Sequence, residues 1–250
     1  MTVKPAKQRL DLLLVERGMA ESRAKAQALI LAGQVVVNER RVDKAGERVS
    51  VDVDLRLKGE VLKYVSRGGL KLEAALNHFG VEVNGAVCAD IGASTGGFTD
   101  CLLQRGAAKV FAIDVGRAQL HEKLRQDPRV ISREGINARH LTREDLPQAV
   151  GVAVVDVSFI SLRQVLPSLV PYLAPGAVLV ALVKPQFEVG RERVAKGGVV
   201  KDAAARTGSI EGIARFVGEL GLDVRGAVDS PISGPAGNVE ALLVACVPPS

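Results

Sequence analysis

A glycine-rich segment near position 90 carries the residue types of a ligand-binding loop. It reads Asp90-Ile91-Gly92-Ala93-Ser94-Thr95-Gly96-Gly97-Phe98-Thr99 and follows an apolar run. Glycines let the backbone turn tightly out of a strand and let a ligand approach without Cβ atoms in the way. The segment lacks the Gly-Lys-Ser/Thr of a P-loop and does not fit the dinucleotide pattern GxGxxG, so a phosphate group is not the expected ligand.

The next apolar run ends in Asp114, whose carboxylate can accept hydrogen bonds from both hydroxyls of a ribose. A glycine loop beside such an acidic strand end suits an adenosine without a pyrophosphate, which is what S-adenosylmethionine presents. The predicted cofactor site comprises Asp90, Gly92, Ser94, Gly96, Gly97, Phe98, Asp114 and Asn137. The alternative is that the glycines only make a turn and that Asp114 caps the following helix.

The elements that must position these residues alternate along the chain. Apolar runs predict strands at 87–91, 110–114, 130–132, 152–157, 178–183, 222–228 and 241–246, and helical spacing appears at 70–78, 99–105, 118–125, 162–172 and 203–220. This alternation predicts an α/β fold with a doubly wound, mostly parallel sheet of about seven strands and helices on both faces. Ligands of such sheets bind at the carboxyl ends of the strands.

The first sixty residues have a different pattern. Helical spacing at 9–18 and 22–32 precedes short strands at 35–38 and 49–55, which predicts a small α+β unit that is too small for an enzyme. We therefore expect a small domain over 1–60, a linker over 61–66 and a catalytic domain over 67–250.

The composition is that of an ordinary globular protein with a mild basic excess. Its 250 residues include 33 Lys and Arg against 28 Asp and Glu, and the first sixty residues carry 12 − 9 = +3. A basic excess favours a polyanionic partner without proving one. The three cysteines have no metal-ligand spacing, so we expect free thiols and no metal site.

One stretch, residues 166–183, is long and uncharged enough to raise the question of a membrane span. It contains Pro167, Pro171, Pro175 and Gly176, which would break a spanning helix. We predict a helix ending near position 172, a turn at Pro175-Gly176 and a buried strand at 178–183. The chain opens on a charged segment without an apolar signal core, so we expect a cytoplasmic protein without a membrane partner.

Several motifs resemble one family over nearly the whole chain and in family order. They are Arg9-Leu10-Asp11, Ser22-Arg23-Ala24-Lys25-Ala26, Gly33-Gln34-Val35, Tyr64-Val65-Ser66-Arg67-Gly68-Gly69-Leu70-Lys71-Leu72, the 90–99 loop, Asp156-Val157-Ser158-Phe159-Ile160 and Val183-Lys184-Pro185-Gln186-Phe187-Glu188. The chain resembles the haemolysin-A (TlyA) family of ribosomal RNA 2′-O-methyltransferases. That family joins an RNA-binding domain, of the type first seen in small-subunit ribosomal protein four, to a methyltransferase domain similar to FtsJ.

The resemblance implies methyl transfer from S-adenosylmethionine to a ribose 2′-hydroxyl of ribosomal RNA, with cytidine as the expected nucleotide. It places a catalytic tetrad on Lys71, Asp156, Lys184 and Glu240, with Asp229 as the competitor for the last position. Lys184 would act as the base or as an orienting group, positioned by the two carboxylates. Lys71 would hold the ribose or a phosphate.

The predicted partner is ribosomal RNA within ribosomal subunits, and the sequence does not indicate the oligomeric state. The predicted RNA contacts are Lys7, Arg9, Arg23, Lys25, Arg40, Arg41 and Arg67. An ordinary mixed surface is the alternative for the cations in the first sixty residues. Tyr64, where some relatives have tryptophan, leaves a stacking role for the linker open. Two other functions stay open: a haemolysin-like membrane-active protein, and a ribosome-assembly factor that binds RNA without catalysis.

Overall fold

The computed structural model describes residues 7–38, 40–51, 53, 55–58, 63–195, 197–234 and 237–249. The chain divides into two compact units, residues 1–61 and 62–250, and each is described by itself. Residues 61 and 62 of the expected linker lie outside the described residues.

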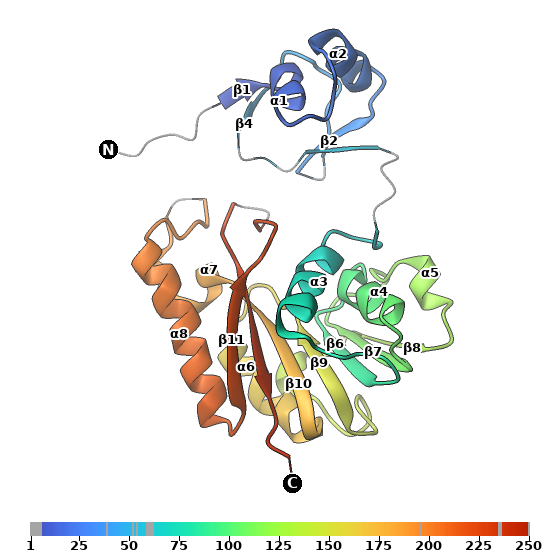
Figure 1. The fold of residues 1–250 in the computed structure, drawn as a ribbon, viewed down its shortest axis with the longest axis vertical. Coiled ribbons are helices and arrows are strands. Elements are labelled where there is room, and N and C mark those ends of the chain that lie inside the picture. Colours follow the sequence, from blue (N-terminus) through green and yellow to red (C-terminus); the bar gives the residue numbers. More distant parts are fainter. Residues whose placement is uncertain are drawn as a thin grey trace. The chain divides into compact units, whose positions relative to one another are not determined.

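A seven-stranded sheet forms the centre of the second unit (Figure 1). Its strands are β6 (Val87–Ile91), β7 (Lys109–Asp114), β8 (Val130–Glu134), β9 (Val150–Val155), β10 (Leu173–Val183), β11 (Asp223–Asp229) and β12 (Ala241–Cys246). They lie in the order β11-β12-β10-β9-β6-β7-β8, and β12 runs antiparallel to both of its neighbours. The prediction of a mostly parallel sheet is confirmed.

Helices cover both faces of this sheet because its strands alternate between two apolar cores (Figure 1). The helices are α3 (Gly68–Phe79), α4 (Gly97–Gln104), α5 (Glu122–Arg125), α6 (Leu162–Leu169), α7 (Pro185–Glu188) and α8 (Ala203–Glu219), with single 3-10 turns at Ala138–His140, Val170–Tyr172 and Arg191–Arg193. On β6, Cys88 joins the core formed with α3 and α4, whereas Ala89 and Ile91 join the core formed with α6 and α8. The alternation of side chains along each strand thus decides which residues pack against the helices on each face.

Two local predictions in this unit are wrong. The turn at Pro175-Gly176 does not separate a helix from a strand, because β10 already begins at Leu173 and takes up the turn as an irregularity in its pairing with β9. The helix expected at 118–125 is reduced to Glu122–Arg125, since Ala118 has a positive φ of 54°. Within the described residues, no helix has the length and apolar character needed to cross a membrane.

The first unit is a small α+β domain, as predicted. It contains α1 (Leu10–Glu16), α2 (Arg23–Leu31), β1 (Lys7–Arg9), β2 (Val35–Val37), β3 (Arg40–Arg41), β4 (Arg48–Ser50) and β5 (Leu55–Leu57). The single strand expected at 49–55 is wrong: β4 pairs with β1, whereas β5 pairs with β2. Apolar periodicity does not reveal that neighbouring valines and leucines serve different sheets.

Candidate active site

The glycine loop leaves the sheet where its strand order reverses, between β6 and β9. This is the crevice in which open α/β sheets bind ligands. The Asp156 backbone N–H donates to the Ile91 carbonyl at 2.9 Å, and a Cβ on Gly92 would lie 2.4 Å from the Asp156 carbonyl oxygen. Gly92, with φ +84°, is therefore required by the close approach of two strand ends of the protein itself.

The second half of the loop begins α4 and packs against the start of α3. A Cβ on Gly97 would lie 2.2 Å from Ser66 Oγ and 2.9 Å from the backbone nitrogen of Gly69. The loop is thus tied to the helix that carries Lys71. Phe98 is buried in the core on this side of the sheet and does not line the hollow described below, so its assignment to the cofactor stays a prediction.

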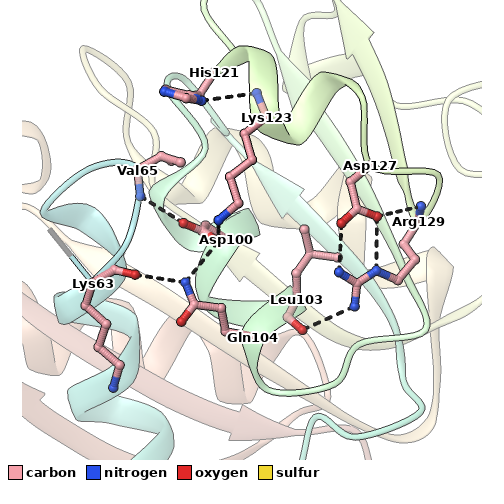
Figure 2. Close-up of polar contacts among 9 residues, drawn as sticks. All are labelled: Lys63, Val65, Asp100, Leu103, Gln104, His121, Lys123, Asp127 and Arg129. Atoms are coloured by element: carbon pink, nitrogen blue, oxygen red, sulfur yellow. Dashed lines mark hydrogen bonds and ion pairs between the residues drawn. The ribbon is translucent and has the colours of Figure 1, made fainter. Parts of the chain in front are cut away.

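Figure 2 shows the hydrogen bonds that connect residues 63–65, which precede α3, to α4. Asp100 is almost fully buried and accepts hydrogen bonds from the Val65 backbone N–H at 2.9 Å and from Gln104 Nε2 at 3.1 Å. Gln104 also donates to the Lys63 carbonyl, and Lys123 Nζ lies 3.5 Å from Asp100. These contacts fix the start of α4 and, with it, the end of the glycine loop.

Tyr64 lies in the same segment but faces inward. Its side chain is 3 % exposed, packs against Gly69 and belongs to the core beneath α3 and α4. A ring buried in this way is not available to stack on RNA, so the stacking role that the sequence left open is contradicted.

Asp114, at the end of β7, holds the loop in place. Its Oδ2 accepts from the Ser94 backbone N–H at 2.8 Å and its Oδ1 from the Gly116 N–H at 2.6 Å. It does not cap the next helix, because α5 is capped by His121. An ionised carboxylate offers about four acceptor positions, so the half-buried Asp114 can still accept from two ribose hydroxyls.

Beside Asp114 lies a hollow that is open to solvent. It is lined by Ala93, Ser94, Ala112, Asp114, Gln119, Leu120, Ser132 and Glu134. Apolar side chains beside two carboxylates are the groups that a purine and a ribose would contact. Of these eight residues, the predicted cofactor site includes Ser94 and Asp114 and misses the other six, although Glu134 could have been found because it ends β8 at the same sheet edge.

Asn137 is placed differently from the other predicted cofactor residues. Its Oδ1 caps the 3-10 turn Ala138–His140 by accepting from the Arg139 backbone N–H at 3.1 Å, and it does not line the hollow. Its role toward a cofactor stays a prediction.

Asp90 is the buried acid at the end of β6. Its Oδ2 accepts from Thr99 Oγ1 at 2.6 Å, whereas its Oδ1 is buried without a hydrogen-bond partner among the described residues. Burial raises the pKa of Asp90 to about 7, and the nearby Asp156 and Asp114 act in the same direction. An unpartnered acceptor at the base of the loop is available to a cationic or N–H-bearing group of a ligand.

The raised pKa of Asp90 predicts a pH-dependent stability. Because the folded state holds this proton more tightly than the unfolded chain, the stabilising contribution is complete below about pH 4 and is lost as pH rises to about 7. Between pH 5 and pH 8, the free energy of unfolding should therefore fall by a few kcal/mol more in the wild type than in Asp90→Asn. Denaturant unfolding at the two pH values measures this difference. Equal losses in both proteins would contradict the burial of an ionisable group here.

Lys184 and Asp156 come together at the ends of β10 and β9. Lys184 Nζ lies 2.7 Å from Asp156 Oδ1 as an ion pair, and its well-aligned hydrogen bond goes to Ser158 Oγ at 2.7 Å. The Lys184 backbone is extended (φ −108°, ψ 102°), as the following Pro185 favours. The Lys184 side chain is 10 % exposed, so its amino group is surrounded mainly by protein, including Asp156 and Ser158.

Lys71 and Glu240 form a second pair, with Lys71 Nζ 2.5 Å from Glu240 Oε2. Glu240 is 1 % exposed and precedes Ala241, which pairs with Val183 next to Lys184. The register of β10 and β12 thus brings both pairs to one edge of the sheet. The competitor Asp229 is largely exposed and pairs with Arg206.

In the first unit, two of the predicted RNA-binding arginines converge on one buried acid. Asp11, with its side chain fully buried, accepts from Arg9 through both oxygens at 3.0 Å and from Arg23 Nε at 2.9 Å. These guanidiniums hold the pKa of the Asp11 carboxyl well below its usual range. The two arginines and Asp11 form a cluster of two cations and one anion, in which Arg9 and Arg23 stay 41 % and 53 % exposed, so their contact with RNA stays a prediction.

The remaining predicted cations differ in their surroundings. Lys25 pairs with Glu21 at 2.9 Å, and Arg40 pairs with Glu47. Lys7 and Arg41 are exposed and have no acidic partner among the described residues of this unit. Arg67 belongs to the second unit, where it is half-buried at the start of α3.

The strand order, the glycine loop after β6, the acid after β7 and the lysine–carboxylate pairs at the same edge together define an α/β domain of the methyltransferase type. The comparison with known proteins agrees: residues 64–246 match the FtsJ-like methyltransferase family and residues 8–55 match the S4 domain. The chain belongs to the FtsJ-like methyltransferase family and carries an S4 domain before the catalytic domain.

Relatives share both parts of the chain. It is 51 % identical to the putative rRNA methyltransferase YqxC of Bacillus subtilis over 95 % of this chain and 85 % of that one. It is 48 % identical to the 16S/23S rRNA (cytidine-2′-O)-methyltransferase TlyA of Mycobacterium tuberculosis, over 94 % and 88 %. A solved structure of a putative hemolysin from Streptococcus thermophilus matches with a TM-score of 0.77 and 45 % identity, covering 99 % and 90 %.

Proposed function

We propose that this protein transfers the methyl group of S-adenosylmethionine to a ribose 2′-hydroxyl of ribosomal RNA, with cytidine as the target nucleotide. The observation that carries the proposal is the meeting of the pairs Lys184–Asp156 and Lys71–Glu240 at the edge of the sheet that also bears the glycine loop. A relative with a defined reaction, TlyA of Mycobacterium tuberculosis, is a 16S/23S rRNA (cytidine-2′-O)-methyltransferase and supports the choice of acceptor.

When bound, S-adenosylmethionine supplies an electrophilic methyl group on a sulfonium. The residues that would hold it are Asp114, which accepts from the ribose hydroxyls, Ser94 and Glu134 around the hollow, and Asp90 below the loop. This methyl group would pass to the ribose oxygen as its bond to sulfur breaks and the electron pair stays on sulfur, so the chain's own residues have to align the hydroxyl and take up its proton.

The two lysines then have separate tasks. Lys184 holds the 2′-hydroxyl in line with the methyl group and, in its amine form, takes the hydroxyl proton as the new bond forms. Asp156 positions Lys184, Glu240 positions Lys71, and Lys71 holds the ribose or a neighbouring phosphate. Most of the rate enhancement is then due to placement.

The function is tested by incubating the purified chain with S-adenosylmethionine and each ribosomal subunit, and by mapping modified nucleotides with mass spectrometry. We expect a 2′-O-methyl mark on cytidine in at least one subunit. Methylation of a base, or no methylation of either subunit by a protein that binds S-adenosylmethionine, would contradict the proposal.

The S4 domain is proposed to dock the substrate RNA through Lys7 and Arg41, which are exposed and have no acidic partner among the described residues of this unit. Arg41→Ala should weaken RNA binding and reduce the slope of log K against log salt by about 1, because one phosphate contact is lost. Lys25→Ala is the matched control and should change the slope less, since Glu21 already neutralises Lys25. Filter binding over a salt series measures both slopes, and an unchanged slope for Arg41→Ala rules out its phosphate contact.

A further inference from the structure

A single helical turn, α7, joins Lys184 to Glu188. Pro185 begins this turn, the Phe187 N–H donates to the Lys184 carbonyl at 2.9 Å, and the Val189 N–H donates to the Pro185 carbonyl at 3.0 Å. Both hydrogen bonds and the fixed φ of proline limit the freedom of the turn. A shift in the position of Glu188 would therefore also shift the backbone of Lys184.

The carboxylate of Glu188 reaches across to another element, the start of α6. It accepts from Ser161 Oγ at 2.6 Å and from the Leu162 backbone N–H at 2.8 Å. Leu162 is the first residue of α6, where backbone N–H groups lack partners within the helix. Ser161 Oγ itself accepts from the Arg163 N–H at 3.1 Å, so Glu188 completes a cap that Ser161 begins.

The loop between β9 and α6 is therefore held at both ends by the same turn. Lys184 binds Asp156 and Ser158 at its beginning, and Glu188 binds residues 161 and 162 at its end. Between them, Phe159 has a φ of +64° and is 92 % exposed. A non-glycine residue in this region is strained, and such a conformation persists only when its surroundings fix it.

We propose that Glu188 is a positioning residue for the transfer reaction, which keeps the Lys184 ammonium in register with Asp156 by locking α7 to the start of α6. The proposal rests on the proposed function, in which Lys184 aligns the 2′-hydroxyl. It assigns Glu188 no contact with the substrate. Burial raises the pKa of Glu188, while the two donated hydrogen bonds act in the opposite direction.

The effect is expected in turnover and not in binding. Glu188→Ala removes both acceptors, so Lys184 loses its fixed position and kcat should fall roughly 10- to 100-fold, the scale of a displacement of about 1 Å. Glu188→Gln retains one acceptor oxygen and should give a smaller loss. Affinity for S-adenosylmethionine and KM for ribosomal subunits should stay at wild-type values, because the glycine loop and the S4 domain are untouched.

The assay uses the full chain, with kcat expressed per S-adenosylmethionine-binding site so that misfolded protein is not counted. Glu211→Gln, an exposed glutamate on α8, is the matched control and should retain wild-type kcat. Ser161→Ala removes one donor to Glu188 and should lower kcat in the same direction. If Glu188 acts through Ser161, then Ser161→Ala should lower kcat by a smaller factor in the Glu188→Ala variant than in the wild type.

Wild-type kcat in both Glu188 variants would overturn the proposal, and so would a fall in Tm without a fall in kcat per binding site. The variant Lys184→Met shows whether such a result contradicts only the positioning role of Glu188 or the proposed function as well. If Lys184→Met abolishes transfer while Glu188→Ala does not, only the positioning role is wrong. If Lys184→Met retains full transfer, the assignment of Lys184 itself is wrong.

Discussion

Lys184→Met should lower the rate of methyl transfer by about 10²–10⁴-fold, the usual worth of a group that aligns a nucleophile and takes its proton. Methionine keeps the apolar stem and removes only the ammonium. The ammonium is held 2.7 Å from both Asp156 and Ser158, so its loss removes a group in a fixed position. S-adenosylmethionine affinity should be unchanged, because Lys184 does not line the hollow beside Asp114.

Single-turnover transfer to ribosomal subunits measures this rate, and calorimetry measures the affinity. Lys109→Met is the matched control: Lys109 lies at the opposite, amino end of the sheet, where it pairs with Val87, and its loss should leave the rate intact. Because Asp156 acts through Lys184, the double variant Asp156→Asn, Lys184→Met should be no slower than Lys184→Met alone. Normal transfer by Lys184→Met with intact cofactor affinity would refute its catalytic role.

The location of residues at strand ends could be predicted, because an apolar run indicates a strand and the polar residue after it indicates where the strand ends. Asp114 and Lys184 follow such runs, and the parallel sheet inferred from the alternation puts its carboxyl ends at one edge. Glu240 could be named only through the family resemblance. Its partner Lys71 lies far away in the sequence, and the contact depends on the pairing of β10 with β12.

The contacts that the sequence could not show share a physical cause: they depend on tertiary packing. The sequence shows Arg9 and Arg23 as two positive charges, but not that both would be bound by the buried Asp11. The sequence shows that Gly92 lies in a loop. It does not show that the Asp156 carbonyl oxygen occupies the space that a Cβ at position 92 would need. Charge and glycine patterns indicate where chemistry is possible, and packing decides what each group binds.

Asp114 has two roles in the proposed function: it supports the glycine loop, and it accepts hydrogen bonds from the ribose of S-adenosylmethionine. Asp114→Ala removes the proposed acceptor for the ribose hydroxyls and also releases the N–H groups of Ser94 and Gly116. Hydrogen bonds to a charged group contribute about 1.5–3 kcal/mol each, and 1.4 kcal/mol is a factor of ten. We therefore expect S-adenosylmethionine affinity, measured by calorimetry, to fall by about 100-fold or more. Asp114→Asn, which retains one acceptor oxygen, should lose less.

An analogue of S-adenosylhomocysteine with a 2′-deoxyribose distinguishes ribose recognition from loop support. The wild type should bind this analogue more weakly than S-adenosylhomocysteine, because one donor to Asp114 is missing. Asp114→Ala should bind the two equally, since its acceptor is already gone. If the variant discriminates between them as strongly as the wild type, Asp114 supports the loop through Ser94 and Gly116 but does not bind the ribose.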